Sequence, residues 1–347
     1  MMVNPAAAKH RLRLATYNVE WFNALFDNRD RLLENNELSA RYKVTRREQL
    51  EALGIVFTAL NADGIMIIEA PNDSRSQRRS TVTALENFAR AFGLRQSRAI
   101  IGFSSDTEQE IAFLYDPDVL DVHHDPRDTA LAPRFDRPHR QDLDGDGVPE
   151  PVRFSKPPLE LSVRFGAQPL RLIGVHAKSK SPRGAENRAD VHRLSIENRR
   201  KQLGECQWLR LRVAAHLAAG EALIVMGDFN DGPGLDEFEK LFGQSGVEVV
   251  IGPEVEPKLR LYDPHADMAL SHRLGLQPTT ARFWLAPQKH YFEALLDYIM
   301  VAPQLVEGAV WRVWHPLNDP EVAAVPELSE ALLQASDHFP VTLDVVF

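Results

Sequence analysis

The sequence predicts an α/β fold, in which buried strands alternate with helices. Short apolar runs typical of buried strands lie at 63–69, 223–228 and 295–301, and each carries a carboxylate at or near one end. Helical patterns with start or stop signals lie between such runs, for example at 45–60 and 189–219. Because α/β folds bind ligands at strand ends, the carboxylates predict a polar site at one edge of a sheet.

Composition narrows the class of protein. The chain has 347 residues, 44% hydrophobic and 26% charged, as in ordinary globular proteins. No run approaches eighteen apolar residues, and residues 1–10 lack the apolar segment of a secretion signal. The single cysteine, Cys206, is expected to be buried and inert. We therefore expect a cytoplasmic monomer without a transmembrane segment, or a secreted or periplasmic protein if an export signal has been trimmed.

The net charge of −9 excludes a protein coated with positive charge for non-specific binding of nucleic acid. One segment is nevertheless basic, which favours either a local face for a phosphate-bearing substrate or an ordinary solvated helix face. Its basic residues are Lys178, Lys180, Arg183, Arg188, Arg193, Arg199, Arg200, Lys201, Arg210 and Arg212.

The first predicted strand runs from Arg11 to Trp21, where polar and apolar residues alternate. Asn18 and Glu20 stand two positions apart near its end, and extended backbone places such side chains on one side. The polar stretch 28–41 is predicted to be a loop.

Two helices are predicted next. Thr45 and Glu48 have the spacing of a capping box, which predicts a helix that ends near residue 60. A second helix is predicted at 80–92, where Gly93 closes it.

The middle of the chain predicts strands at 110–115, 152–165 and 170–176, and the last of these delivers His176. The segment 121–150 is rich in Pro, His, Arg and Asp and is predicted to be a loop.

A long helix is predicted at 189–219 and a short one at 236–242. An irregular region is predicted after residue 242 and extends to about residue 279. The last predicted strand covers 341–346.

Within the loop at 121–150, Asp142, Asp144 and Asp146 alternate, with Glu150 at the ninth position. This spacing is similar to that of calcium-binding loops, although Arg153 stands where an EF-hand has its bidentate Glu. The interpretations are a structural Ca²⁺ site or a plain Asp-Gly hairpin turn.

The run from Leu223 to Met226 stops at Gly227, and Asp228 and Asn230 follow on one side of the chain. A carboxylate can activate water, and a carboxamide can donate hydrogen bonds to an anionic oxygen. Comparable polar residues end five other predicted strands: Asn18 with Glu20, Glu69, His176, Asp297, and Asp337 with His338.

These residues stand in motifs that resemble those of the endonuclease/exonuclease/phosphatase superfamily, which includes deoxyribonuclease I. The matching segments are Thr16-Tyr-Asn18-Val-Glu20, Ile68-Glu69, Gly227-Asp228-Phe-Asn230, Leu296-Asp297-Tyr-Ile and Ser336-Asp337-His338-Phe-Pro. The chain departs from the family pattern at Ile68, where Gln is usual. The segment in which Lys156 precedes two prolines is similar to one in deoxyribonuclease I. The spacing of His176 and Lys178 is similar to a motif of deoxyribonuclease-like and sphingomyelinase-like members.

The resemblance implies a four-layer sandwich of two face-to-face mixed β-sheets flanked by helices. It implies one domain over 1–347, with insertions near 28–41, 121–150 and 252–279, loops that usually decide the substrate.

The resemblance also implies a mechanism that depends on Mg²⁺ or Mn²⁺. Its implied metal ligands are Asn18, Glu20, Glu69 and Asp337, its catalytic residues are His176, Asp228, Asn230, Asp297 and His338, and its phosphate contacts are Lys156 and Lys178. Which histidine acts as base and which as acid stays open.

The function predicted first is a metal-dependent phosphodiesterase, with nucleic acid as the expected substrate and an Asp-activated water as the nucleophile. The alternatives are a phosphomonoesterase or lipid phosphohydrolase, since Trp284, Trp311 and Trp314 could serve a lipid surface as well as a core. A catalytically silent phospho-ligand binding protein is a further alternative.

Overall fold

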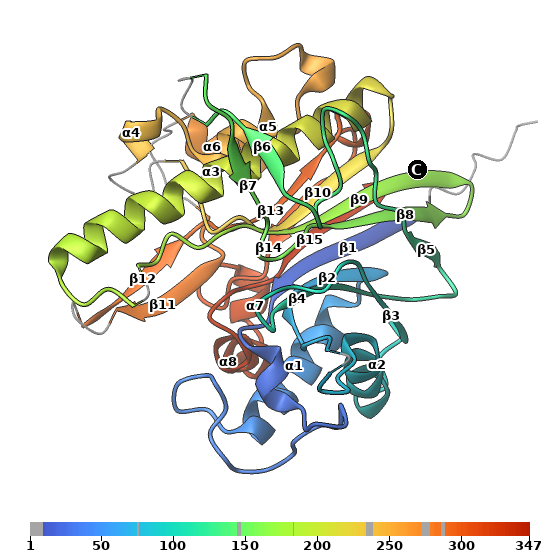
Figure 1. Ribbon diagram of the computed structural model, residues 1–347. Helices are drawn as coiled ribbons and strands as arrows, with labels where there is room; N and C mark the ends of the chain where they lie inside the picture. Colours follow the sequence, from blue (N-terminus) through green and yellow to red (C-terminus); the bar gives the residue numbers. More distant parts are fainter. Residues whose placement is uncertain are drawn as a thin grey trace, which may run out of the picture.

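The computed structural model describes residues 10–74, 76–143, 147–182, 184–233, 239–271, 278–285 and 289–347. Two β-sheets lie face to face, and helices cover the outer face of each, so the fold has four layers (Figure 1). None of the helices in these ranges combines the length and hydrophobicity that crossing a bilayer requires.

The larger sheet has the strand order β14-β15-β1-β2-β4-β3, and the smaller has the order β13-β10-β9-β8-β5. The six strands of the larger sheet are β1 (Arg11–Asn18), β2 (Gly64–Ala70), β3 (Arg98–Ile101), β4 (Glu110–Tyr115), β14 (Val310–Val313) and β15 (Val341–Val346). The five strands of the smaller are β5 (Leu120–His124), β8 (Leu159–Phe165), β9 (Gln168–His176), β10 (Leu223–Asp228) and β13 (Asp297–Val301).

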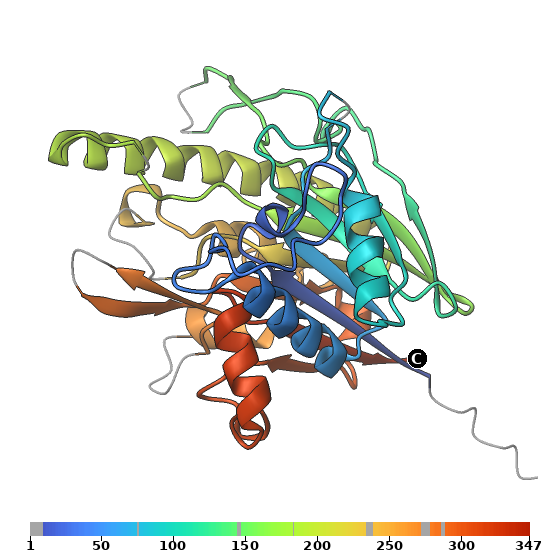
Figure 2. The same ribbon diagram turned by 90° about the horizontal axis from the view of Figure 1, so that it is seen from below.

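The helices form the outer layers. Figure 2 shows three of them across the outer face of the larger sheet, namely α1 (Arg46–Leu60), α2 (Thr81–Ala91) and α8 (Pro326–Ala335). The smaller sheet is covered by α3 (Arg188–Ala218), α5 (Gly246–Ile251) and α6 (Pro264–Leu270). Shorter pieces are α4 (Glu239–Phe242), α7 (Pro320–Ala323), η1 (Phe22–Leu25), η2 (Pro257–Leu259), η3 (Pro303–Leu305), and the ribbons β6 (His139–Gln141) with β7 (Glu150–Val152) and β11 (Ala281–Leu285) with β12 (His290–Ala294).

Alternation along the central strands fills the cores on both sides of each sheet. On β1, Leu14 packs between the sheets, whereas Tyr17 packs under the helices of the larger sheet. On β10, Ile224 packs between the sheets and Val225 packs under α3. Both faces of β10 pack against apolar side chains, which explains its continuous hydrophobic run.

The topology brings the ends of four strands to one edge. β1 and β2 are parallel and joined through α1, and β9 and β10 are parallel and joined through α3. β13 and β15 run antiparallel to β10 and β1, so their starting residues lie at this same edge. Six segments that are distant in sequence therefore end or begin together.

Elements with local start and stop signals are confirmed. Thr45 and Glu48 form the capping box of α1, and Ser80 caps α2, which ends just before Gly93 at φ 60°. The long helix α3 is capped by Asn187 and ends before Gly220 at φ 70°. Cys206 is buried, as predicted.

The loop predicted at 121–150 is wrong in part, because β5 begins at Leu120 and pairs with β8, and because β6 at 139–141 pairs with β7, which begins at Glu150. The apolar residues Leu120 and Val122 of β5 are buried, and the intervening Asp121 is exposed. An edge strand this short, with charged outer residues, has the composition of a loop.

The strand predicted at 152–165 is also shorter than expected. β8 begins at Leu159 because Pro157 and Pro158, which lack the N–H that a sheet ladder needs, precede it. The strand predicted at 110–115 is β4 rather than the third strand of the chain, since the prediction missed β3.

The irregular region predicted from 243 to about 279 is wrong in part, because it contains α5 and α6. Ser245 and Glu248 form the capping box of α5, and the N-cap Asp263 of α6 accepts hydrogen bonds from the N–H groups of His265 and Ala266. The sequence analysis also missed the ribbon β11–β12 and the elements β14, α7 and α8. Of the helix predicted at 236–242, residues 236–238 lie outside the described residues.

The basic segment is not one solvated face. Arg199 Nη1 lies 2.7 Å and Lys180 Nζ 2.6 Å from Oδ1 of the fully buried Asp231. Arg212 Nε lies 3.2 Å from buried Glu160. Arg199 and Arg212 join α3 to neighbouring elements, whereas Lys180 joins the segment before α3 to Asp231. Such buried pairs stabilise the fold only while both partners are present.

Gly227 is required by the packing of β10 on β9. Its φ is 142°, and a Cβ at this position would lie 2.0 Å from the carbonyl oxygen of Val175. We expect Gly227→Ala to lower the free energy of unfolding by about 2–4 kcal/mol in urea denaturation, through strain and overpacking. Gly220→Ala is the matched control, because Gly220 also has a positive φ but no atom within 4 Å of a Cβ, and about 1–2 kcal/mol is expected. Equal losses in both variants would contradict the steric explanation.

Candidate active site

Three polar residues face one another in register across the smaller sheet. Asp228, the last residue of β10, lies opposite His176 on β9 and Asp297 on β13. Their side chains are nearly inaccessible to solvent, at 1%, 4% and 1%. Because Gly227 lets β10 approach β9 closely, the same glycine sets the position of Asp228.

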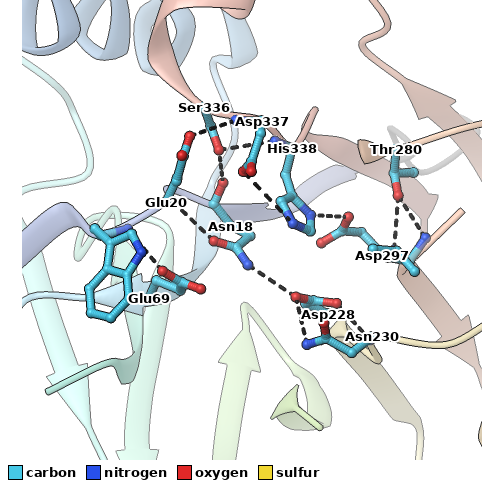
Figure 3. Close-up of polar contacts among 12 residues, drawn as sticks. Asn18, Glu20, Glu69, Asp228, Asn230, Thr280, Asp297, Ser336, Asp337 and His338 are labelled. Carbon is cyan, nitrogen blue, oxygen red and sulfur yellow. Dashed lines mark hydrogen bonds and ion pairs between the residues drawn. The ribbon is translucent and has the colours of Figure 1, made fainter. Parts of the chain in front are cut away.

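Asp228 accepts hydrogen bonds from both sheets (Figure 3). Asn18 Nδ2, at the end of β1, lies 3.0 Å from Asp228 Oδ2. Asn230 donates through its backbone N–H at 2.7 Å and through Nδ2 at 3.1 Å. Burial raises the pKa of Asp228 to about 7, although the charge of His338 opposes the shift. A carboxylate of this pKa can accept a proton near neutral pH.

His338 forms a buried pair with Asp297, whose Oδ2 lies 2.8 Å from His338 Nδ1. Thr280 Oγ1 accepts the N–H of Asp297 at 2.9 Å and so fixes that residue. Burial alone lowers the pKa of His338, but the charge of Asp297 and of nearby carboxylates outweighs it and raises this pKa well above the ordinary value. His338 is therefore held as an imidazolium.

His176 has the opposite character. Its Nε2 lies 3.7 Å from Asp228 Oδ2 and 3.4 Å from Lys156 Nζ, and its Nδ1 has no hydrogen-bond partner among the described residues. Burial, together with the charges of Lys156 and His338, lowers the pKa of His176 well below its ordinary value. The two histidines thus differ in protonation.

Glu69 and Glu20 form the acidic side of the site, next to Asp337. Glu69 Oε2 accepts the N–H of Trp21 at 2.9 Å, and burial raises its pKa. Burial and the charge of Asp337 raise the pKa of Glu20 to about 7. Arg41 opposes this shift through an ion pair at 2.6 Å, which ties the loop at 28–41 to the site.

Several of these residues have strained backbones. The φ angles are 40° at Glu20, 58° at Trp21, 61° at Glu69 and 50° at Asn230. Glu20 therefore does not continue β1, and the expectation that it shares one side of a strand end with Asn18 is wrong. The left-handed conformation costs about 1–3 kcal/mol for a residue other than glycine, and such strain is typical of functional sites.

The fold brings together nearly all the predicted site residues: Asn18, Glu20, Glu69, Lys156, His176, Asp228, Asn230, Asp297, Asp337 and His338. Lys178 follows β9, and its backbone N–H donates to Glu205 Oε2 at 2.7 Å.

The predicted calcium loop is only partly described, since Asp144 and Asp146 lie outside the described residues. Asp142 accepts the N–H of Gly147 at 2.9 Å, and Glu150 pairs with Arg200 at 2.5 Å. The calcium site therefore stays a prediction.

Within the described ranges, one group of acidic and imidazole ligand atoms is compact enough for a metal ion. It consists of Asp228, Asp297 and His338, whose ligand atoms lie within 4.8 Å of one another. This group differs from the predicted ligands. Because the pKa of His338 is raised and its Nδ1 already bonds Asp297, we interpret the group as a proton-transfer cluster and keep the acidic residues as the candidate ligands.

The residues that hold the candidate catalytic side chains and their loops were not predicted from the sequence. Besides Thr280 and Trp21, these are Glu205 and Gln202 on the inner face of α3. One sequence feature could have revealed Gln202 and Glu205. They are polar residues three positions apart on the helix face that bears Cys206 and Leu209, where a buried helix is expected to be apolar.

Replacement of Asp297 by Asn removes the charge that holds the proton on His338. We expect Asp297→Asn to lower the pKa of His338, measured by an NMR titration of the imidazole nitrogens. The His139 signal is the internal reference, because burial alone lowers the pKa of that residue. An unchanged His338 titration would contradict the assigned pair.

Glu205 provides a test of buried charge through stability. Its pKa in the folded protein is raised by burial from 4.5 to about 7, so the folded state holds a proton that the unfolded state has lost. Unfolding free energy should therefore fall as pH rises from 4.5 to 7, by up to about 3 kcal/mol. Glu205→Gln keeps an acceptor for Lys178 and should remove this component, measured by urea denaturation at pH 5 and pH 8. Identical pH dependence in both proteins would refute the buried charge.

Comparisons with known proteins agree with the fold. The model of the Endonuclease/Exonuclease/phosphatase family matches residues 15–338. Among solved structures, TDP2 from Caenorhabditis elegans is 13% identical with a TM-score of 0.49, and the match covers 97% of this chain and 75% of that one. A family protein from Bacteroides thetaiotaomicron is 15% identical with a TM-score of 0.45, covering 98% of each chain. The endonuclease domain of the TRAS1 retrotransposon is 12% identical with a TM-score of 0.47, covering 96% and 98%.

No curated protein matches the sequence. The family match nevertheless extends from β1 to His338 and so includes every polar strand end described above. Two large mixed sheets flanked by helices are the fold of this family, as predicted. The chain belongs to the endonuclease/exonuclease/phosphatase family.

Proposed function

We propose that the protein is a phosphodiesterase that depends on Mg²⁺ or Mn²⁺, with nucleic acid as its substrate. Its family is generally one of phosphoric ester hydrolases. The observation that carries the proposal is the convergence of Asp228 with the buried Asp297–His338 pair, whose ligand atoms lie within 4.8 Å of one another. Asp228 as proton acceptor and His338 as proton donor thus lie close together, as in-line hydrolysis of a phosphate ester requires.

The acidic residues fit a hard divalent cation. Glu20, Glu69 and Asp337 offer carboxylate oxygens, and burial, together with the charge of Asp337, raises the pKa of Glu20 and Glu69. A cation would favour the charged forms of these carboxyls, and oxygen ligands are those that Mg²⁺ and Mn²⁺ prefer. Glu69 is the principal candidate ligand, because Arg41 already pairs with Glu20. When bound, the cation supplies neutralisation and polarisation of the phosphoryl oxygens.

Asp228 is suited to orient and deprotonate the attacking water. Asn18 and Asn230 donate to it, so its orientation is set. Asn230 Nδ2 also donates to the carbonyl of Ala177 at 3.2 Å. Asn230 therefore positions Asp228 in this state, in addition to its proposed contact with the phosphate in the transition state.

The two imidazoles divide the remaining roles. His338 is protonated and buried, which suits stabilisation of phosphate charge or protonation of the leaving oxygen. His176 is neutral, which suits a hydrogen bond to phosphate beside Lys156. Lys178 is proposed as a more distant phosphate contact.

A lipid phosphohydrolase is the second candidate. Trp284 and Tyr291 are 47% and 50% exposed on the ribbon β11–β12, while Phe283 of the same ribbon contacts His338. Trp314 is buried and Trp311 donates to the carbonyl of Ile299, so these two belong to the core. A silent binding protein is disfavoured because the sequence lacks none of the expected catalytic side chains, whereas a silent relative would be expected to have lost at least one.

The proposal is tested with bis-p-nitrophenyl phosphate and Mg²⁺ or Mn²⁺, beside the matching monoester, single-stranded and duplex DNA, RNA and sphingomyelin vesicles. We expect diester hydrolysis that EDTA abolishes and that Asp228→Asn reduces by about 10²–10⁴-fold. Asp344→Asn is the matched control, because Asp344 is a buried aspartate paired with Arg13 at the opposite end of the larger sheet.

Preference for the monoester or the vesicles would replace the nucleic-acid proposal by one of its alternatives. Full activity of Asp228→Asn would refute the mechanism, and inactivity of the wild-type protein on every substrate would favour the binding protein.

A further inference from the structure

We infer that Gln202 of α3 is a positioning residue that holds the His176 and Asp228 strand ends in their active arrangement. The inference rests on the proposed function, since it concerns the geometry of the same site. Gln202 is fully buried and lies on the helix that connects β9 to β10, the two strands that it would align.

One amide group joins the two strand ends. Gln202 Nε2 lies 2.9 Å from the carbonyl oxygen of Lys178, which follows His176. The same nitrogen lies 3.1 Å from the carbonyl oxygens of Phe229 and Asn230, which follow Asp228. The two protons of this amide are thus shared among three carbonyl groups from two loops.

These carbonyls need such a donor. The ladder between β9 and β10 ends where the N–H of Ala177 donates to the carbonyl of Asp228 at 2.9 Å. Beyond that point, three carbonyl oxygens turn toward one buried position, where their dipoles repel one another. A buried acceptor without a partner costs free energy, and this cost falls if the two loops move apart. Because the amide of Gln202 donates to all three carbonyl oxygens, the loops can stay close together without this cost.

Two neighbours hold Gln202 and its loops in place. Arg199 Nη1 donates to Gln202 Oε1 at 3.1 Å, and the same guanidinium pairs with Asp231 at 2.7 Å. Glu205 accepts the N–H of Lys178 at 2.7 Å, so α3 binds the Lys178 residue at both its N–H and its carbonyl. Residues 199, 202 and 205 follow one another at helical spacing on one face, which makes α3 a rigid support.

The consequence for catalysis is geometric. His176 Nε2 and Asp228 Oδ2 lie 3.7 Å apart, and each side chain is attached one or two residues before a carbonyl that Gln202 binds. A shift of about 1 Å between catalytic groups costs on the order of 10²-fold in rate. Loss of the amide should therefore reduce turnover without removing any group that touches the substrate.

The test compares Gln202→Met with Gln96→Met in the full chain. Gln96 is equally buried and also donates to a backbone carbonyl, that of Ala62, but Ala62 precedes β2 at the end opposite Glu69. Each substitution keeps the side-chain volume and removes one amide. We expect Gln202→Met to lower kcat for bis-p-nitrophenyl phosphate by about 10-fold or more with KM within about threefold, and Gln96→Met to change both by less than about twofold.

Hydrogen–deuterium exchange provides a readout that is independent of activity. Gln202→Met should increase exchange in the peptides that contain 177–182 and 229–233, whereas Gln96→Met should leave them unchanged. Gln202→Glu, which replaces the donor by an acceptor, should behave like Gln202→Met and carries the comparison if the methionine variant does not fold.

Unchanged exchange in both loops, or a kcat within twofold of the wild-type value, would overturn the inference. If the wild-type protein hydrolyses no diester, the proposed function fails, yet the exchange experiment still decides whether Gln202 holds the two loops.

Discussion

The arrangement of the site depends on the close approach of β9 and β10 at Gly227. The glycine lets the β10 backbone lie against Val175, at a distance that no side chain would permit. That contact places Asp228 in register with His176 on one side and with Asp297 on the other. Asn18 of the larger sheet donates a hydrogen bond to Asp228, and this bond links the polar edges of the two sheets.

The same edge concentrates the energetic cost of the fold. His176, Asp228, Asp297 and His338 are buried there, the surrounding carboxylates and Lys156 are half-buried, and Glu20, Trp21, Glu69 and Asn230 have left-handed backbones. Burial of ionisable groups is unfavourable unless hydrogen bonds or opposite charges compensate. The partners in this site offset only part of the desolvation cost, as the raised pKa values of Asp228 and Glu20 indicate. The apolar cores on both sides of each sheet must offset this cost.

The parts of the fold that local signals determine could be predicted from the sequence. The capping box of α1, the run that forms β10 and the stop of α3 are all read from neighbouring residues. The edge strand β5 and the ribbon β11–β12 could not, because their pairing partners are distant and their composition is that of loops. Most site residues were found because each ends an apolar strand. The roles of Arg199 and Glu205 were missed, since only the three-dimensional packing shows which polar residues of a helix are buried.

The site draws on both ends of the chain. Ser336 donates to the carbonyl of Asn18 at 2.8 Å, and β15 lies between β1 and β14 in the larger sheet. During synthesis, Asn18 and Glu69 leave the ribosome about three hundred residues before His338 does. The edge that carries the candidate site is therefore completed only when β15 is inserted beside β1. A nascent chain would carry most of the fold while still lacking His338, so the proposed catalytic arrangement can form only after nearly all of this sequence has been synthesised.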